Sequence, residues 1–134
     1  MATRARIGLM LDDGSVISCY SHWDNYPEGA GKILTTEYDT REKAEELIDG
    51  GDISSLRTNR DWNGVETESA RVLYYSERGE EGTEPQHSDT LGDFICTTRE
   101  CWGEFAYVFD LEPNKWVCYN MYDSQEVNLY ETSN

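Results

Sequence analysis

Four side chains that can exchange protons fall within seven residues near the N-terminus: His22, Asp24, Tyr26 and Glu28. A histidine beside a carboxylate can act as general acid and base. Trp23 lies among them, and a loop this rich in rings either packs onto the protein or binds something. No activated nucleophile accompanies these residues, and the same residue types also build a turn. The stretch is therefore a candidate site for a small enzyme or ligand-binding domain, with a structural turn as the stronger interpretation.

Two other chemistries fit the sequence poorly. Gly29-Ala30-Gly31-Lys32 partly resembles a phosphate-binding loop, but Ile33 stands where that motif needs a hydroxyl. A zinc site needs four soft ligands at recognisable spacing. The cysteines contain no CxxC pair, and the two histidines, His22 and His87, lie in unrelated contexts. We therefore expect no metal, no cofactor, no catalytic residue and four reduced, structural thiols. Those thiols are Cys19, Cys96, Cys101 and Cys118.

The net charge of −16, from 27 acidic and 11 basic residues, argues against direct nucleic-acid binding. The charge is uneven, because residues 77–134 contain 13 acidic side chains and only Arg78, Arg99 and Lys115 as bases. Long-range attraction to a basic protein surface is one use of such a charge, and solubility is the other. We predict a partner-binding surface made of carboxylates and one aromatic anchor. Its residues are Glu77, Glu80, Glu81, Glu84, Asp89, Asp93, Glu100, Glu104 and Trp62.

The number of charges also matches a short piece of DNA. Duplex DNA carries one negative charge per roughly 1.7 Å, so 16 charges correspond to about 27 Å of helix. A globule of 134 residues is about 36 Å across. The protein could therefore imitate a short duplex, provided that its carboxylates gather on one face.

Two β-hairpins are the clearest elements. In residues 6–20, alternating apolar residues, the turn Asp12-Asp13-Gly14 and a β-branched run predict the first hairpin. Residues 105–119 predict the second, with a proline-containing turn between two apolar runs. A short strand is expected at 71–77 and an edge strand at 127–130.

Helices are predicted between and after these strands. Apolar spacing favours helices over 32–38, 41–49 and 90–100, and Asp39 or Thr40 and then Asp89 offer the caps. The remaining segments are connections: a tight polar one at 52–56, an irregular loop at 57–69 and a solvated, mobile loop at 77–85.

Together these elements predict one α+β domain over residues 1–134. It would have a mainly antiparallel sheet of five to six strands, built on the two hairpins, with two to three short helices on one face. Few aliphatic side chains are available, so the 12% aromatic residues must supply much of the core. No apolar run approaches the roughly 18 residues of a membrane span, so we expect no membrane contact.

Two motifs resemble a group of small acidic proteins encoded by bacteriophages and prophages. They are His22-Trp23-Asp24-Asn25-Tyr26-Pro27-Glu28-Gly29-Ala30-Gly31 and Gly51-Asp52-Ile53-Ser54-Ser55-Leu56. Asn25 stands where that group usually has glycine. Residues 107–109 and Trp116 also look like the group's final hairpin. The resemblance implies a phage or prophage origin and an accessory role, and it implies no mechanism.

These observations lead to a ranked set of expectations. The first is a non-enzymatic phage accessory protein in the host cytoplasm, which binds a host protein with a basic surface, with imitation of DNA as one form of this binding. The second is an enzyme or ligand-binding domain at residues 22–28. The third is a minor virion component. A monomer and a homodimer formed through an edge strand both remain open.

Overall fold

The computed structural model shows how the two hairpins join into one sheet. It describes residues 3–23, 25–56, 72–111, 114–123, 125–127 and 129, with the backbone alone at 55, 73, 77 and 78. The irregular loop predicted at 57–69, including Trp62, lies outside the described residues, as do Asp24 and Tyr130.

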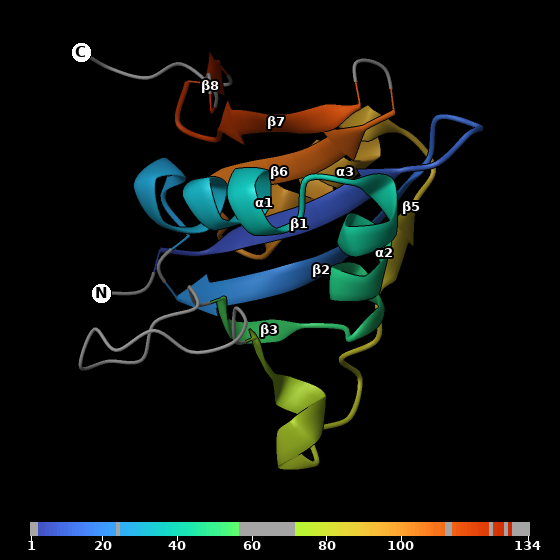
Figure 1. The fold of residues 1–134 in the computed structure, drawn as a ribbon, viewed down its shortest axis with the longest axis vertical. Helices are drawn as coiled ribbons and strands as arrows, with labels where there is room; N and C mark the ends of the chain where they lie inside the picture. The colour runs from blue at the N-terminus through green and yellow to red at the C-terminus, as the bar shows by residue number, and fades with distance from the viewer. Residues whose placement is uncertain are drawn as a thin grey trace.

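In the described part of the chain, eight strands form a single sheet with β1 near its middle (Figure 1). The order is β4-β3-β2-β1-β6-β7-β8, and β5 pairs with the other end of β2. The strands are β1 (Ala5–Met10), β2 (Val16–Trp23), β3 (Ile53–Leu56), β4 (Val72–Tyr74), β5 (Gln86–Ser88), β6 (Phe105–Asp110), β7 (Lys115–Asn120) and β8 (Glu126–Val127).

The predicted hairpins are confirmed as β1–β2 and β6–β7, both antiparallel. They meet through a parallel pairing of β1 with β6, in which Ile7 lies opposite Tyr107. The β2–β3 pairing is also parallel. The predicted α+β class is confirmed, but the sheet is mixed and has more strands than the five to six expected.

The three helices begin close to the predicted residues. They are α1 (Lys32–Glu37), α2 (Arg41–Asp49) and α3 (Leu91–Glu100). Thr40 caps α2, because its hydroxyl accepts a hydrogen bond from the Lys43 amide at 3.2 Å. Thr90, and not the predicted Asp89, caps α3 in the same way. None of these helices is long and apolar enough to cross a bilayer, within the part of the chain that the structure describes.

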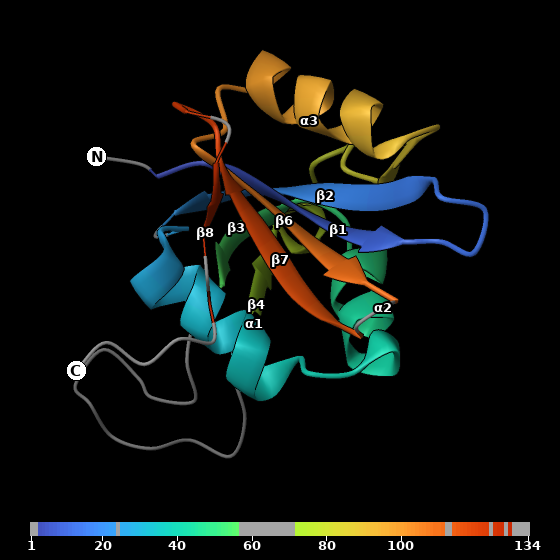
Figure 2. The ribbon, with the colours of Figure 1, turned by 90° about the horizontal axis from the view of Figure 1, so that it is seen from above.

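The helices lie on both faces of the sheet, so the prediction of one helical face is wrong. Figure 2 shows α1 and α2 on one side and α3 on the other. The larger core lies under α1 and α2, and a smaller one under α3 contains Val16, Phe94, Ala106 and Val108. Gly8 lets α3 approach β1, because a Cβ at Gly8 would lie 2.7 Å from a Val16 methyl group and 3.2 Å from the Phe94 ring.

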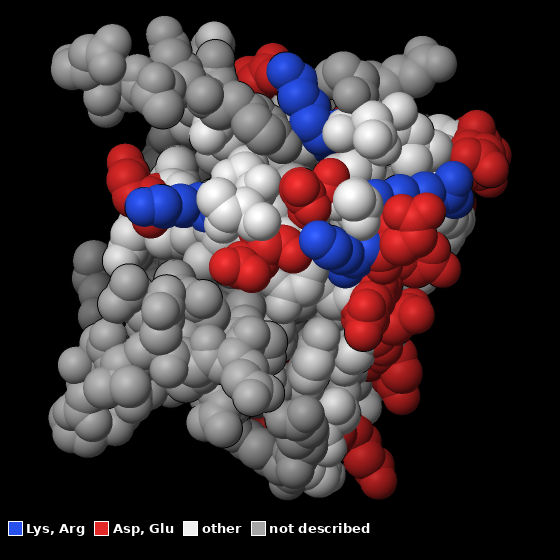
Figure 3. Space-filling view, in the orientation of Figure 1, with Lys and Arg blue, Asp and Glu red and all other residues white. Residues whose placement is uncertain are grey.

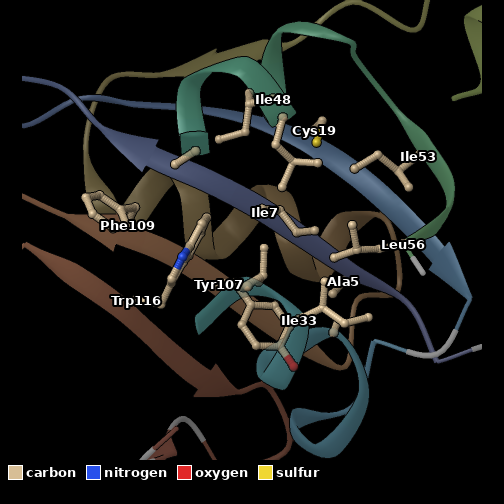
Figure 4. Packing of buried hydrophobic residues seen from close by; sticks show 14 of the residues in the cluster. Ala5, Ile7, Cys19, Ile33, Ile48, Ile53, Leu56, Tyr107, Phe109 and Trp116 are labelled. Atoms are coloured by element: carbon tan, nitrogen blue, oxygen red, sulfur yellow. The ribbon is translucent and has the colours of Figure 1, made fainter. Parts of the chain in front are cut away.

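Aromatic rings fill much of the larger core, as their number in the sequence suggests (Figure 4). Tyr107, Phe109 and Trp116 are almost fully buried, and the last two meet edge to face at a centroid distance of 5.4 Å. The Trp116 indole donates a hydrogen bond to the Tyr38 carbonyl at 2.8 Å, which ties β7 to the end of α1.

Several connections are more regular than predicted. Residues 53–56 form β3 instead of a tight connection, and residues 86–88 form β5. A one-turn π-helix, η1 (Pro27–Gly31), leads into α1, and a 3₁₀ turn, η2 (Tyr75–Arg78), follows β4. The edge strand expected at 127–130 is present as β8, only two residues long at 126–127.

Candidate functional site

The segment after β2 is held to the body of the protein by Asn25. Its side-chain amide donates to the Thr3 carbonyl at 2.9 Å, and its backbone amide donates to the same oxygen at 3.2 Å. The Asn25 carbonyl accepts a hydrogen bond from the buried Tyr107 hydroxyl at 2.6 Å. This segment is therefore anchored to β1 and β6, which is the structural role that the turn interpretation expects.

His22 lies at the end of β2 among aromatic groups. Its Nδ1 is 2.6 Å from the Tyr20 hydroxyl, and its ring meets Trp23 edge to face at 4.7 Å. Burial lowers the pKa of His22, and the positive charge of Arg4 lowers it further. Glu28 is exposed, in η1, and Asp24 lies outside the described residues. Among the described residues, no carboxylate forms a hydrogen bond or an ion pair with His22. A general acid and base paired at residues 22–28 therefore stays a prediction.

The predicted acidic residues converge with one that the prediction did not include. Asp49, at the end of α2, lines a hollow of about 670 Å³ together with Glu80, Glu81 and Glu84 from the loop before β5. We call these four residues the acidic edge. All four are exposed, and none of their carboxylates forms an ion pair or hydrogen bond with a described residue. In Figure 3, acidic side chains continue without basic ones down the right-hand edge below α2.

The loop that carries Glu80, Glu81 and Glu84 is solvent-exposed, as the sequence predicts, and one backbone hydrogen bond ties it to the chain after α2. The Asp52 amide donates to the Thr83 carbonyl at 2.8 Å. Gly51 has φ +86°, and a Cβ there would lie 2.2 Å from the same carbonyl oxygen. Burial raises the pKa of Asp52, and the negative charge of Glu84 raises it further.

The remaining predicted acidic residues do not join this edge. Asp89, Asp93 and Glu100 belong to α3 or its start, on the other face of the sheet (Figure 2). Glu104 precedes β6, where its carboxylate accepts a hydrogen bond from the Tyr122 hydroxyl at 2.7 Å. The side chain of Glu77 is outside the described atoms, as is Trp62. The structure therefore divides the predicted surface into an edge and separate carboxylates.

Exposed aromatic rings gather at the end of the sheet where β1 and β6 begin and β2 and β7 finish. Trp23 and Tyr26 are 43% and 41% exposed, and Trp102 and Tyr122 are 77% and 79% exposed. The sequence prediction did not include Trp102. It directly follows the predicted helix, where an aromatic side chain is expected to pack into the core. It has a positive φ of 63°, in the turn that ends α3.

The cysteines differ in burial. All four thiols are free, with Cys19 and Cys118 buried and Cys96 exposed on α3. Burial raises the pKa of both Cys19 and Cys118 to about 12. Among the described residues, no three His, Cys, Asp or Glu side chains are grouped so that they could hold a metal ion.

Comparisons with known proteins found no match to this chain. No protein-family model matches the chain, and neither the curated proteins nor the solved structures contain a significant match.

Proposed function

We propose that this chain is a non-enzymatic binding protein that uses the acidic edge to engage a basic surface of a partner protein. The observation that carries this proposal is the convergence of Asp49 with Glu80, Glu81 and Glu84 around one hollow, without an ion pair to any described residue. Like charges placed together repel, so this cluster does not stabilise the fold unless a positively charged group binds to it.

The position of Asp49 adds to this argument. It is the last residue of α2, whose final turn also carries Glu45 and Glu46 and contains no basic residue. The C-terminal end of a helix has a partial negative charge, which favours Lys or Arg and disfavours carboxylates. Helix and loop therefore place negative charge where it costs stability, which is typical of a surface selected for binding.

The class of partner follows from the charge. Complementary charge speeds association and gives specificity for a basic patch, such as one that normally contacts phosphates. Imitation of DNA is the finer form of this proposal. The resemblance of residues 22–31 and 51–56 to small phage and prophage proteins supports a host protein in the host cytoplasm as the partner.

A competition experiment tests the proposal. A fluorescein-labelled DNA duplex is bound to a lysine-rich, sequence-nonspecific DNA-binding protein, and its displacement by this chain is followed by fluorescence anisotropy at 50 and 300 mM NaCl. We expect displacement at low salt that weakens steeply at high salt.

Two triple variants separate a specific edge from general acidity. Glu80→Gln/Glu81→Gln/Glu84→Gln should weaken displacement at least tenfold. Asp89→Asn/Asp93→Asn/Glu100→Gln removes the same number of charges from the α3 side and should leave displacement within about twofold of the original chain. Equal losses in both variants, or displacement that does not depend on salt, would contradict the proposal.

A further inference from the structure

A buried guanidinium that forms no ion pair with a described residue lies on the α3 side of the sheet, where its positive charge lowers the pKa of Asp52 against the effect of burial. Arg6, on β1, is only 5% exposed. Its Nε donates to the Ser18 hydroxyl at 3.0 Å and its Nη2 to the Ser18 carbonyl at 3.1 Å. Both acceptors are neutral, and no ion pair involves Arg6 among the described residues. A buried charge without a counter-charge is expensive, and in a chain of net charge −16 it is also unexpected.

A second guanidinium lies beside the first. Arg4 precedes β1 by one residue, and residues two apart on an extended chain share a face about 7 Å apart. Arg4 is half-buried, and its guanidinium group forms no hydrogen bond or ion pair within the described structure. Two arginine forks on one face can hold the oxygens of a single oxyanion between them.

Tyr20 and His22 complete this group from β2. Arg6 lies opposite Tyr20 in the antiparallel register, and the next step on this face brings Arg4 opposite His22. The Tyr20 hydroxyl and His22 Nδ1 lie 2.6 Å apart and share a hydrogen bond. Burial and the positive charge of Arg4 lower the pKa of His22, which favours the neutral imidazole. In the tautomer that accepts from the Tyr20 hydroxyl at Nδ1, the ring proton is on Nε2 and is one more donor for a ligand.

Two described carboxylates close to these arginines, Asp52 and Glu104, have hydrogen-bond partners of their own. Asp52 accepts a hydrogen bond from the Tyr20 backbone amide at 2.9 Å. The Glu104 amide donates to the Arg4 carbonyl, but the Glu104 carboxylate accepts its hydrogen bond from the Tyr122 hydroxyl. Neither carboxylate forms an ion pair with Arg4 or Arg6. Arg6 also forms a side-chain hydrogen bond with Cys101, so within the described structure the donors left for a ligand are mainly those of Arg4.

We infer that Arg4, Arg6, Tyr20 and His22 form a binding site for an oxyanion, either a phosphate group or a carboxylate. The guanidinium groups supply charge and paired N–H donors, and the imidazole supplies a further donor. At physiological ionic strength, charges more than about 8 Å away are largely screened, so the distant carboxylates do not prevent local binding. This site is separate from the acidic edge and does not depend on the proposed function.

The two histidines make the test direct, because His22 belongs to the site and His87 does not. The ¹⁵N-labelled full chain is titrated with sodium phosphate, and in a parallel arm with sodium acetate, at pH 7.5 and constant ionic strength held with NaCl. We expect a saturable shift of the His22 imidazole resonances, with a millimolar Kd, and none of His87. Saturation by one anion only identifies the preferred oxyanion. A response of His22 to neither anion, or an equal response of both histidines, would overturn the inference.

Variants of exposed and buried arginines sharpen the result. Arg4→Gln, at a half-buried position, should weaken binding at least tenfold, whereas Arg41→Gln, an arginine paired with Asp12 at 3.5 Å, should not change it. Arg6→Lys keeps the charge but loses the fork, and should weaken binding while leaving the fold intact by circular dichroism. If Arg6→Lys fails to fold, the comparison of Arg4→Gln with Arg41→Gln still decides, and equal Kd values in those two variants would contradict the site.

Discussion

Tyr107 links the core to the segment after β2, and its hydroxyl group can be removed without changing the shape of the core. The hydroxyl donates to the buried Asn25 carbonyl at 2.6 Å. Tyr107→Phe leaves that carbonyl without this donor, so we expect the free energy of unfolding to fall by about 1–3 kcal/mol. Urea unfolding should show a lower midpoint with an unchanged m-value.

Tyr119→Phe is the matched control for this prediction. Tyr119 lies on the same hairpin and is partly buried, and no hydrogen bond of its hydroxyl is found in the described structure. Its loss should change the free energy of unfolding by less than about 0.5 kcal/mol. Equal effects of the two substitutions would mean that the Tyr107 hydroxyl does not anchor the segment.

Thiol reactivity should separate the cysteines by burial. Only the thiolate reacts, and a raised pKa keeps a thiol protonated at a higher pH. With a pKa of about 12, Cys19 and Cys118 are about one part in 10⁴ thiolate at pH 8. Cys96 is exposed and should react with Ellman's reagent first.

Mass spectrometry of the labelled peptides identifies the reacting residue, and Cys96→Ser should abolish the fast phase. Reaction of the buried thiols should require unfolding at pH 8 and should accelerate as the pH rises toward 12. Fast labelling of Cys19 in the folded protein would contradict the burial described here.

At the scale of elements, Gly51 holds the acidic loop against the end of α2. Gly51→Ala faces two costs, because φ is +86° and the new Cβ would lie 2.2 Å from the Thr83 carbonyl oxygen. We expect a loss of about 2–4 kcal/mol, which adds the left-handed backbone cost to the cost of the steric clash. Thermal and urea unfolding measure this loss.

Gly79→Ala isolates the cost of the positive φ. Gly79 also has a positive φ, +81°, but nothing lies within 4 Å of a Cβ at that position. This variant should lose only the backbone term, about 1–2 kcal/mol. If the two variants are equally stable, the docking of the loop on Gly51 contributes little to the fold.

The elements that the sequence predicts well have local signals, and those it misses depend on distant partners. Asp12-Asp13-Gly14 marks the first hairpin, and Thr40 and Gly50 bound α2. The strand β3 is hidden because a bulge between Ile53 and Ser55 breaks the alternation of apolar residues. The residues under α3 include Gly8 and Ala106, which are too small to mark that face of the sheet as buried.

The candidate sites likewise combine residues that are close in sequence with residues that only the fold brings together. Glu80, Glu81 and Glu84 are close in sequence and could be predicted as one group, whereas Asp49 joins them only because Asp52 pairs with Thr83. In the sequence alone, nothing distinguishes Arg4 and Arg6 from other charged residues. Only the fold places Arg6 opposite Tyr20 in the register between β1 and β2 and brings the charge of Arg4 close to His22.

At the scale of the whole molecule, the net charge of −16 should weaken the fold at low salt. Screening of the repulsion should raise the free energy of unfolding as NaCl increases from 20 to 500 mM. Urea is the suitable denaturant, because it is uncharged and does not itself screen. A free energy of unfolding that is independent of NaCl would mean that opposite charges already balance locally across the surface.

The two triple variants then distinguish charge that opposes folding from charge that supports it. At 20 mM NaCl, Glu80→Gln/Glu81→Gln/Glu84→Gln should raise the free energy of unfolding by about 0.5–1 kcal/mol, because unpaired like charges are relieved beside Asp49. Asp89→Asn/Asp93→Asn/Glu100→Gln should not raise it, since Asp93 lies in the first turn of α3, where the helix favours a carboxylate. If the first variant is more stable but also competes less well for the basic protein, the acidic edge is retained for binding at a cost in stability. If the first variant is more stable and still competes equally well with DNA for the basic protein, the charge of the acidic edge serves solubility instead.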